Sequence, residues 1–400
     1  AFPAPIVASG LFVLSLGVCM AFASHYPIPP PHDDAVEYLS LARNLAAGNG
    51  FSTDGISPAV YRPPLFSSLL GGWFFLTGTT SLASAAFFQS LLHAGGAVAA
   101  FFLFLELAPA AWALFGALFL ALHPVLVTRV VFVLQEPTII LFTTLAALAS
   151  LRLIRAPSGP KAALAGVAWG VCILAKSVAG FAPLLLVATR WLPASFRTGI
   201  TRREGLMLLL AAALTLAPWT IRNEIRFGRF IPVNGQGSGI LLWNIEHTEV
   251  TGDPERERLV SAIGQDGGES SETKERILRF VSRHPREFLL ERTLLNIVHF
   301  ASPPRDWWIS RGLVHPGERP PLFWLLSLLF WLPPFAVLPF ATMSAIGKRA
   351  SPPALCFLIL LYWGYWAEHA LVWGDPRYGL AVYPVLMAIG LSTVARWRRP

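Results

Sequence analysis

Charged residues are scarce in this sequence. Asp, Glu, Lys and Arg make up only 14% of its 400 residues, whereas 54% are hydrophobic and the mean hydropathy is +0.56. A soluble protein of this length needs more polar surface, and several apolar runs here are long enough to cross a bilayer. The composition therefore excludes an ordinary soluble protein and predicts an all-α polytopic membrane protein.

Cysteine is scarce as well, and the spacings of common ligand-binding motifs are missing. Cys19, Cys172 and Cys356 all lie inside apolar runs, which favours packing over disulfides or metal ligation. The histidines are scattered without the spacing of a zinc site. The sequence has no P-loop, GxGxxG pattern or other Gly-rich phosphate loop. Their absence disfavours a nucleotide sugar or ATP as a direct donor.

The positive charge is gathered in short clusters between the apolar runs. The net charge is +8, and the basic clusters are Arg152/Arg155/Lys161, Arg190/Arg197/Arg202/Arg203, Lys348/Arg349 and Arg396/Arg398/Arg399. Cytoplasmic loops of membrane proteins carry such clusters, so inside-facing charge accounts for them better than nucleic-acid binding does. We therefore expect no nucleic-acid partner.

Placing all four clusters in the cytoplasm predicts about ten transmembrane helices with both termini inside. The run Leu65–Gly78 is short for a span and is expected to be interfacial or re-entrant. The run Ala162–Ala188 is expected to form two half-length helices around Lys176, with one tilted span as the alternative. The first apolar run lacks a small-residue cleavage pattern, so we expect it to be retained. The predicted spans are Pro5–Ser24, Leu82–Leu107, Ala110–Val127, Pro137–Leu153, Ala162–Ala175, Val178–Ala188, Gly205–Thr220, Pro321–Thr342, Pro353–Val372 and Gly379–Val394.

This topology predicts one membrane domain, residues 1–400, with its conspicuous polar residues on the outer face. Residues 25–80 form a first outer loop with interfacial helices, expected to be catalytic, and residues 221–320 form a long outer loop that caps donor and acceptor. Within the long loop, Glu255–Val260 and Glu272–Arg283 are predicted to be amphipathic helices. A transporter would be expected to place ionisable residues near mid-membrane, so this grouping at one surface favours chemistry there.

The most polar stretch follows the first apolar run and reads HDDAVEYLSLARNLAAGNGFSTDGISPAVYRPPL. Two adjacent carboxylates, Asp33 and Asp34, precede a helical segment whose apolar face includes Tyr38. Either carboxylate could cap that helix. The functional interpretation is a general base for an acceptor hydroxyl, or a ligand for a divalent cation.

Basic residues at the outer ends of several predicted spans suggest a phosphate site. Arg62, Arg222 and Arg377, with Lys176 behind them, could reach the lipid headgroups. Alternatively, their planar guanidinium groups bind phosphate oxygens in a bidentate way and stabilise a leaving phosphate. Glu136, in FVLQEP, is either a plain helix-start acid or a second carboxylate on the same face.

Taken together, these segments resemble a known group of membrane enzymes. The chain is similar to polyprenyl-phosphate-dependent GT-C glycosyltransferases of the family 39-like group. That group includes protein O-mannosyltransferases, lipid A aminoarabinose transferases and rhizobial lipopolysaccharide-core transferases. The resemblance covers nearly the whole chain and rests on the order of DDAVEYLSLARNLAAGNGF, YRPPLFSSLL, VTRVVFVLQEP, APWTIRNEIRFGRFIPVNGQGSG and DPRYGLAVYPVL.

The resemblance implies a GT-C fold and a set of site residues. Asp33 matches the presumed catalytic base, Asp34 stands where the mannosyltransferases usually have Glu, and Glu136 matches the acid heading the fourth span. The predicted catalytic residues are thus Asp33, Asp34 and Glu136. The predicted substrate-binding residues are Tyr38, Arg62, Lys176, Arg222, Asn223, Arg377 and Tyr378. No metal is required, although Asp33 and Asp34 would hold a divalent cation if one is used.

The implied activity is sugar transfer from a polyprenyl-phosphate donor to a hydroxyl or similar group of a lipid, polysaccharide or protein. The expected location is a bacterial inner membrane, with the active site facing the periplasm or exterior and membrane lipids as further partners. Three alternatives remain: an O-antigen ligase or polymerase, a lipid or polysaccharide transporter, and a non-catalytic membrane scaffold that would tolerate loss of Asp33.

Overall fold

The computed structural model describes residues 3–26, 28–193, 196–235, 253–266, 271–301, 332–346, 352–371 and 374–397, with a few single residues between them. The regular elements of the described part are all helices, and it contains no strand. Its helices are α1 Ala4–His25, α2 Asp34–Ala46, α3 Pro64–Thr77, α4 Leu82–Leu105, α5 Ala110–Ala121, α6 Pro124–Thr128, α7 Glu136–Arg155, α8 Gly159–Ala175, α9 Phe181–Ala188, α10 Arg202–Phe227, α12 Glu255–Asp266, α13 Ser271–Arg283, α14 Arg292–Ala301, α17 Leu332–Ile346, α18 Pro353–Leu371 and α19 Tyr383–Trp397.

Six helical segments in the described residues are long and apolar enough to cross a membrane. They are α1, α4, α7, α10, α18 and Tyr378–Arg396, and the pair α5–α6, bent by 44°, adds a seventh if it is one span. The chain is a multi-pass membrane protein, as the composition predicts. The predicted number of ten spans is not confirmed, because α8 and Ser177–Trp191 are shorter and much of Pro321–Thr342 lies outside the described residues.

Local sequence signals place several helix ends. Pro64 opens α3, and Gly78 ends it with a φ of 68°, a conformation that costs glycine nothing. Thr201 and Glu204 form a capping box at the start of α10. This helix continues through Pro218 to Phe227, so the prediction that it ends at Thr220 is wrong. The predicted break at Lys176 is confirmed, because α8 ends at Ala175 and Lys176 is extended.

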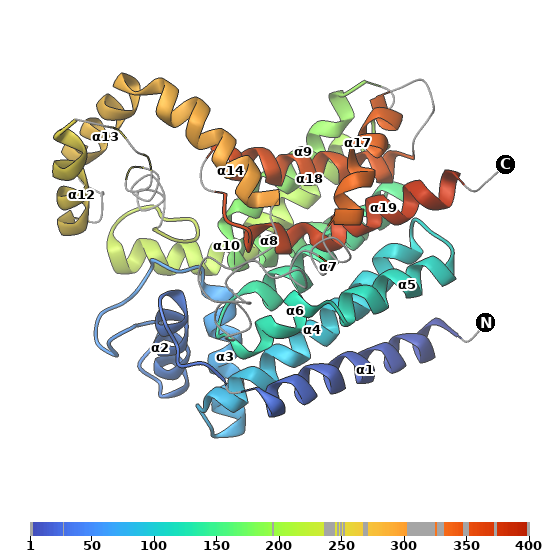
Figure 1. Ribbon diagram of the computed structural model, residues 1–400, viewed down its shortest axis with the longest axis horizontal. Coiled ribbons are helices and arrows are strands. Elements are labelled where there is room, and N and C mark those ends of the chain that lie inside the picture. The colour runs from blue at the N-terminus through green and yellow to red at the C-terminus, as the bar shows by residue number, and fades with distance from the viewer. Residues whose placement is uncertain are drawn as a thin grey trace.

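Two hydrophobic clusters join the helices around the polar stretch. The larger cluster packs α4, α5, α7, α8, α18 and α19 together. The smaller one packs α2 and α3 against the C-terminal half of α1 and residues 127–134, with Tyr38 and Phe66 at its centre. In Figure 1, α2 lies at the opposite end of the molecule from the start of α1 and the end of α19. The polar stretch is thus anchored at one end of the helical bundle.

Helices α12 and α13 form a small cap beside this end of the bundle (Figure 1). Leu259, Ile277 and Phe280 are buried where the cap helices meet Phe288. The predicted amphipathic helices of the long loop are therefore confirmed, and each is longer at one end than the sequence pattern indicates. The three cysteines are buried and free, as predicted.

Candidate active site

The side chains of the two adjacent aspartates at the start of α2 lie in different surroundings. Asp33 precedes the helix with a φ of 48°, the one positive value among the non-glycine residues that the structure describes. Its side chain is 90% exposed and lies 3.1 Å from His32 Nδ1. Asp34 is the first residue of the helix, and its side chain is 23% exposed. No side-chain bond caps α2, so the interpretation of either carboxylate as its cap is wrong.

Asp34 lies between two arginines from distant parts of the chain. Arg62 Nη2 donates to Asp34 Oδ1 at 2.7 Å, and Arg377 Nη2 lies 3.0 Å from Asp34 Oδ2. Arg62 also donates through Nε to Glu37 Oε2 at 2.6 Å, one helical turn along α2. Asp375 accepts from the backbone N–H of Arg377 at 2.9 Å. The structure thus brings Arg62 and Arg377 together at Asp34, and their predicted contact with the donor phosphate stays a prediction.

Both arginines remain charged despite their burial. Burial by itself lowers the pKa of Arg62, but the hydrogen bond to Glu37 and the charge of Asp34 raise that pKa above its ordinary value. For Arg377, burial likewise lowers the pKa, and the charges of Glu136, Asp375 and Asp34 more than offset it. The site therefore holds two permanent cations around one carboxylate.

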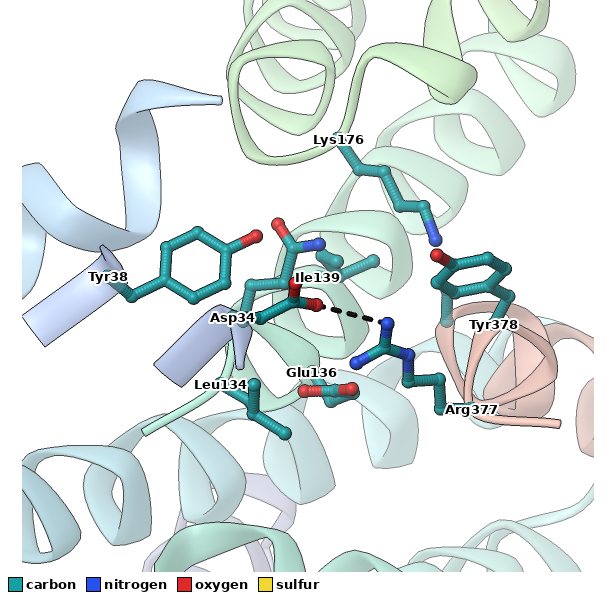
Figure 2. Close-up of a pocket in the computed structure, with 10 residues that line it drawn as sticks. Asp34, Tyr38, Leu134, Glu136, Ile139, Lys176, Arg377 and Tyr378 are labelled. Atoms are coloured by element: carbon teal, nitrogen blue, oxygen red, sulfur yellow. Dashed lines mark ion pairs between the residues drawn. The ribbon is translucent and has the colours of Figure 1, made fainter. Parts of the chain in front are cut away.

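A small, narrow pocket lies beside Asp34 (Figure 2). Its polar lining comes from α2, from the start of α7, from the break after α8 and from the segment before α19: Asp34, Tyr38, Gln135, Glu136, Lys176, Arg377 and Tyr378. Glu136 is 7% exposed, and its Oε2 atom has no hydrogen-bond partner among the described residues. Figure 2 shows the Glu136 carboxylate beside the Arg377 guanidinium group. A buried acceptor without a donor is costly unless a ligand supplies one.

Lys176 reaches the same pocket from the other side (Figure 2). Its Nζ atom lies 3.3 Å from the centre of the Tyr378 ring, a cation–π contact. Burial lowers the pKa of Lys176 below its ordinary value. The break between α8 and α9 thus serves to bring one amine to the pocket, while Tyr38 closes it from α2.

A larger cavity lies on the other side of Asp34, with about 1250 Å³ of empty space, part of it open solvent. Residues 29–35 form one wall, and Arg129, Asp375 and Arg377 contribute charges. Asp34 and Arg377 line both this cavity and the small pocket. The ion-paired cluster therefore stands at the junction of two spaces, where two substrates could meet.

Arg222 and Asn223 lie elsewhere, since neither lines the small pocket or the large cavity. Arg222 donates to the carbonyl oxygens of Ala59 at 2.8 Å and Phe51 at 3.3 Å. Asn223 is buried and donates to the carbonyl of Ile231 at 2.9 Å. Both residues tie the end of α10 to neighbouring loops. The structure does not bring them to the cluster, and their predicted contact with the donor stays a prediction.

Three charged residues of the site are absent from the sequence-based assignment. Glu37 follows Asp34 by three residues on the same helix face, and Asp375 stands two residues before Arg377. These spacings could have indicated both. Arg129 had no such signal, because its charged neighbours in the cavity lie about 95 and 247 positions away in the sequence. Among the described residues, no group of three or more His, Cys, Asp and Glu side chains is arranged to hold a metal ion.

No protein-family model and no curated protein matches the sequence, but several solved structures match the fold. One is the archaeal oligosaccharyltransferase AglB from Archaeoglobus fulgidus in complex with an inhibitory peptide and a dolichol-phosphate. The TM-score is 0.58 at 16% identity over 98% of this chain and 50% of AglB. The apo form of the same oligosaccharyltransferase gives 0.56 at 15% identity, over 98% of this chain and 50% of that one.

ArnT from Cupriavidus metallidurans bound to undecaprenyl phosphate also matches. The TM-score is 0.57 at 16% identity over 99% of this chain and 60% of ArnT. The chain thus spans only half to three-fifths of the length of these proteins. At such low identity the likeness concerns the fold alone, and it confirms the expected fold class: the chain has the GT-C fold.

Proposed function

We propose that this protein transfers a sugar from a polyprenyl-phosphate donor to a hydroxyl or similar group of an acceptor. The single observation that carries the proposal is the position of Asp34 between Arg62 and Arg377, at the junction of two cavities. A transfer of this kind needs a cationic site for the leaving phosphate and a base beside the acceptor. The cluster offers both within one set of contacts.

The two arginines suit the phosphate of the donor. A guanidinium group holds two phosphate oxygens at once. The phosphate of the donor is a diester with two free oxygens, and the leaving polyprenyl phosphate gains a further charged oxygen that the two arginines stabilise. Asp34 occupies the position between them. We infer that the donor phosphate takes over these contacts and that Asp34 is thereby released from two positive neighbours. Donor binding would then free this carboxylate to meet the acceptor hydroxyl.

We assign the catalytic base to Asp34 rather than to Asp33. The released carboxylate of Asp34 takes the proton of the acceptor hydroxyl, and the hydroxyl oxygen forms a bond to the anomeric carbon. The bond from that carbon to the phosphate oxygen breaks, and its electron pair leaves with the polyprenyl phosphate. Attack from the face opposite the phosphate inverts the anomeric centre. Asp33, with its exposed side chain, is less suited to hold an acceptor in place.

We propose that one side of the sugar contacts the polar groups of the small pocket. Glu136 has an unpartnered oxygen there, and Lys176, Tyr38 and Tyr378 add donors and a ring surface. Sugar hydroxyl groups pair readily with such a mixture of carboxylate, amine and aromatic side chains. Because two arginines neutralise a monophosphate leaving group, we expect the reaction to need no divalent cation.

The structural neighbours support the proposal in general terms. AglB was solved with a dolichol-phosphate and ArnT with undecaprenyl phosphate, both lipid phosphates. We propose that residues 221–320 take part in recognising the acceptor. The basic clusters favour a cytoplasmic location for the loop around residue 156. We therefore propose that Asp34 faces the outer side of a bacterial inner membrane.

Mass spectrometry of envelope glycolipids and glycoproteins tests the proposal in cells. Cells that express the wild-type protein should contain at least one glycoconjugate heavier by one sugar than its counterpart in cells lacking the gene. Cells expressing Asp34→Asn at equal membrane levels should match the deletion. A difference of many repeating units would instead indicate a ligase or polymerase. A product unchanged by Asp34→Asn would indicate a transporter or scaffold.

A further inference from the structure

Arg129 is a buried cation that the proposed mechanism does not use. It begins the short 3-10 helix that follows α6, and its side chain is 4% exposed. Its Nε and Nη2 atoms are enclosed and have no hydrogen-bond partner, and no carboxylate among the described residues pairs with it. Its guanidinium carbon lies 5.8 Å from the centre of the Phe132 ring, a cation–π contact.

A guanidinium group in this state is unfavourable for the folded protein. Removing a charged group from water costs several kcal/mol unless partners replace the lost hydrogen bonds. The other buried arginines of the site, Arg62 and Arg377, have carboxylate partners. An arginine without one is retained for packing or for a ligand that supplies the missing anion.

The surroundings of Arg129 favour a ligand. Arg129 lines the large cavity together with Asp33, Asp34, Asp375 and Arg377. Arg377 is already paired with carboxylates in that lining, so Arg129 is the cation available to an incoming anion. The backbone that follows Arg129 is also held in place, because Gln89 donates through Nε2 to the carbonyl oxygens of Val130 and Phe132.

We propose that Arg129 forms a second anion-binding subsite, in the large cavity, for a phosphate or carboxylate group carried by the acceptor. This inference rests on the proposed function, in which Arg62 and Arg377 bind the donor phosphate. The cavity presents three carboxylates, which repel an anionic acceptor unless a cation offsets them. With its anionic group on Arg129, the same molecule can place a hydroxyl beside Asp34. The acceptor is thereby predicted to be an acidic glycolipid or polysaccharide rather than a neutral one.

Thermal unfolding of the purified full-length protein in detergent tests this subsite. The variants are Arg129→Met, which keeps the length of the side chain, and Arg190→Met as a control outside both cavities. Each is measured with inorganic phosphate against chloride at equal ionic strength, with undecaprenyl phosphate, and with both together. Without ligands, Arg129→Met should unfold at or above the wild-type temperature, since it removes an unpaired buried charge. A purely structural arginine would instead give a lower unfolding temperature.

The measurements with ligands distinguish an anion bound at Arg129 from the donor phosphate bound at Arg62 and Arg377. Inorganic phosphate should stabilise the wild type even when undecaprenyl phosphate is saturating, and Arg129→Met should weaken phosphate binding by about tenfold or more. Its affinity for undecaprenyl phosphate should change less than about threefold, and Arg190→Met should behave like the wild type.

Three results would overturn the inference. They are an absence of any phosphate effect on the lipid-loaded wild type, unchanged phosphate binding in Arg129→Met, or a loss of affinity for undecaprenyl phosphate in Arg129→Met as large as its loss of affinity for phosphate. The last would assign Arg129 to the donor site. If undecaprenyl phosphate does not stabilise the wild type at all, the proposed function fails and the acceptor assignment fails with it. A phosphate effect lost in Arg129→Met would even then establish the anion subsite.

Discussion

Asp34 is bound by Arg62 and Arg377 much as a donor phosphate would be. Its two carboxylate oxygens each face a guanidinium group, at 2.7 Å and 3.0 Å. A phosphate that displaces it gains two charge-assisted contacts, whereas the carboxylate loses the groups that hold its negative charge. Binding of the donor and activation of the base are coupled in this arrangement, because both depend on the same two arginines.

The first prediction concerns these arginines. Arg62→Ala and Arg377→Ala should each weaken binding of undecaprenyl phosphate at least tenfold, since a hydrogen bond to a charged group contributes about 1.5–3 kcal/mol. Arg62→Lys should retain part of the affinity as a point charge without the planar fork. Binding to the purified protein can be followed by tryptophan fluorescence. Normal affinity in both alanine variants would place the phosphate elsewhere.

The second prediction concerns Arg222, whose guanidinium group is engaged with loop carbonyls. Arg222→Met should destabilise the protein by about 1–3 kcal/mol, because the carbonyls of Phe51 and Ala59 lose their donor. Affinity for undecaprenyl phosphate in detergent should stay within a few-fold. The exposed neighbour Arg226, changed to Met, is the matched control and should alter neither property. A large loss of lipid affinity with unchanged unfolding temperature would restore Arg222 to the donor site.

At the scale of elements, the contact of α2 with α3 sets the position of Asp34. Gly71 of α3 is buried, and a Cβ atom there would lie 2.9 Å from the Ala42 carbonyl oxygen and from Leu45 Cβ. The next residue, Gly72, is exposed and has no atom within 4 Å of such a position. The two neighbouring glycines therefore allow a matched pair of substitutions.

The third prediction uses this pair. Gly71→Ala should lower stability by about 1–3 kcal/mol and reduce transfer activity, because α2 must move away from α3. Gly72→Ala should leave activity intact and stabilise the helix by about 0.5–1 kcal/mol. Thermal unfolding and turnover are measured on the same preparations. Equal behaviour of the two variants would show that the α2–α3 contact does not position the site.

Much of the element order follows from the sequence, whereas one decisive detail does not. Apolar periodicity and the Pro64 and Gly78 signals predict α2 and α3 close to their observed bounds. The choice between Asp33 and Asp34 depends on where the helix begins, and one residue turns a side chain by about 100°. Both are good capping residues, so no local preference separates them. The distant partners Arg62 and Arg377 decide the orientation.

Arg222 and Arg129 illustrate the same limit for the site. The motif around Arg222 indicates a cation at the end of a span, but its partners are backbone carbonyls some 160 residues earlier, which no side-chain pattern reveals. Arg129 is one of many basic residues in the sequence and is distinguished only by its burial without a partner. Charge and periodicity in the sequence identify candidate site residues, and the tertiary contacts show which of them lie at the site.

At the scale of the whole molecule, the basic clusters predict which end of the bundle faces the cytoplasm. Ile56, in the first polar loop, and Ala156, between α7 and α8, are both exposed. Single cysteines at these positions, with the three buried native cysteines replaced, can be labelled by a membrane-impermeant reagent in intact cells. Ile56→Cys should react, and Ala156→Cys should react only after lysis. The reverse result would place Asp34 in the cytoplasm and exclude an outer-face transfer.

The most direct test of the account measures turnover by the purified protein in liposomes. The assay follows consumption of undecaprenyl-phosphate sugars with a crude lipid and polysaccharide extract as acceptor. Asp34→Asn should bind undecaprenyl phosphate and yet transfer about 100- to 10,000-fold more slowly than the wild type, since an amide takes no proton. Asp33→Asn should stay within a few-fold of the wild type. An active Asp34→Asn together with an inactive Asp33→Asn would contradict the account at its centre.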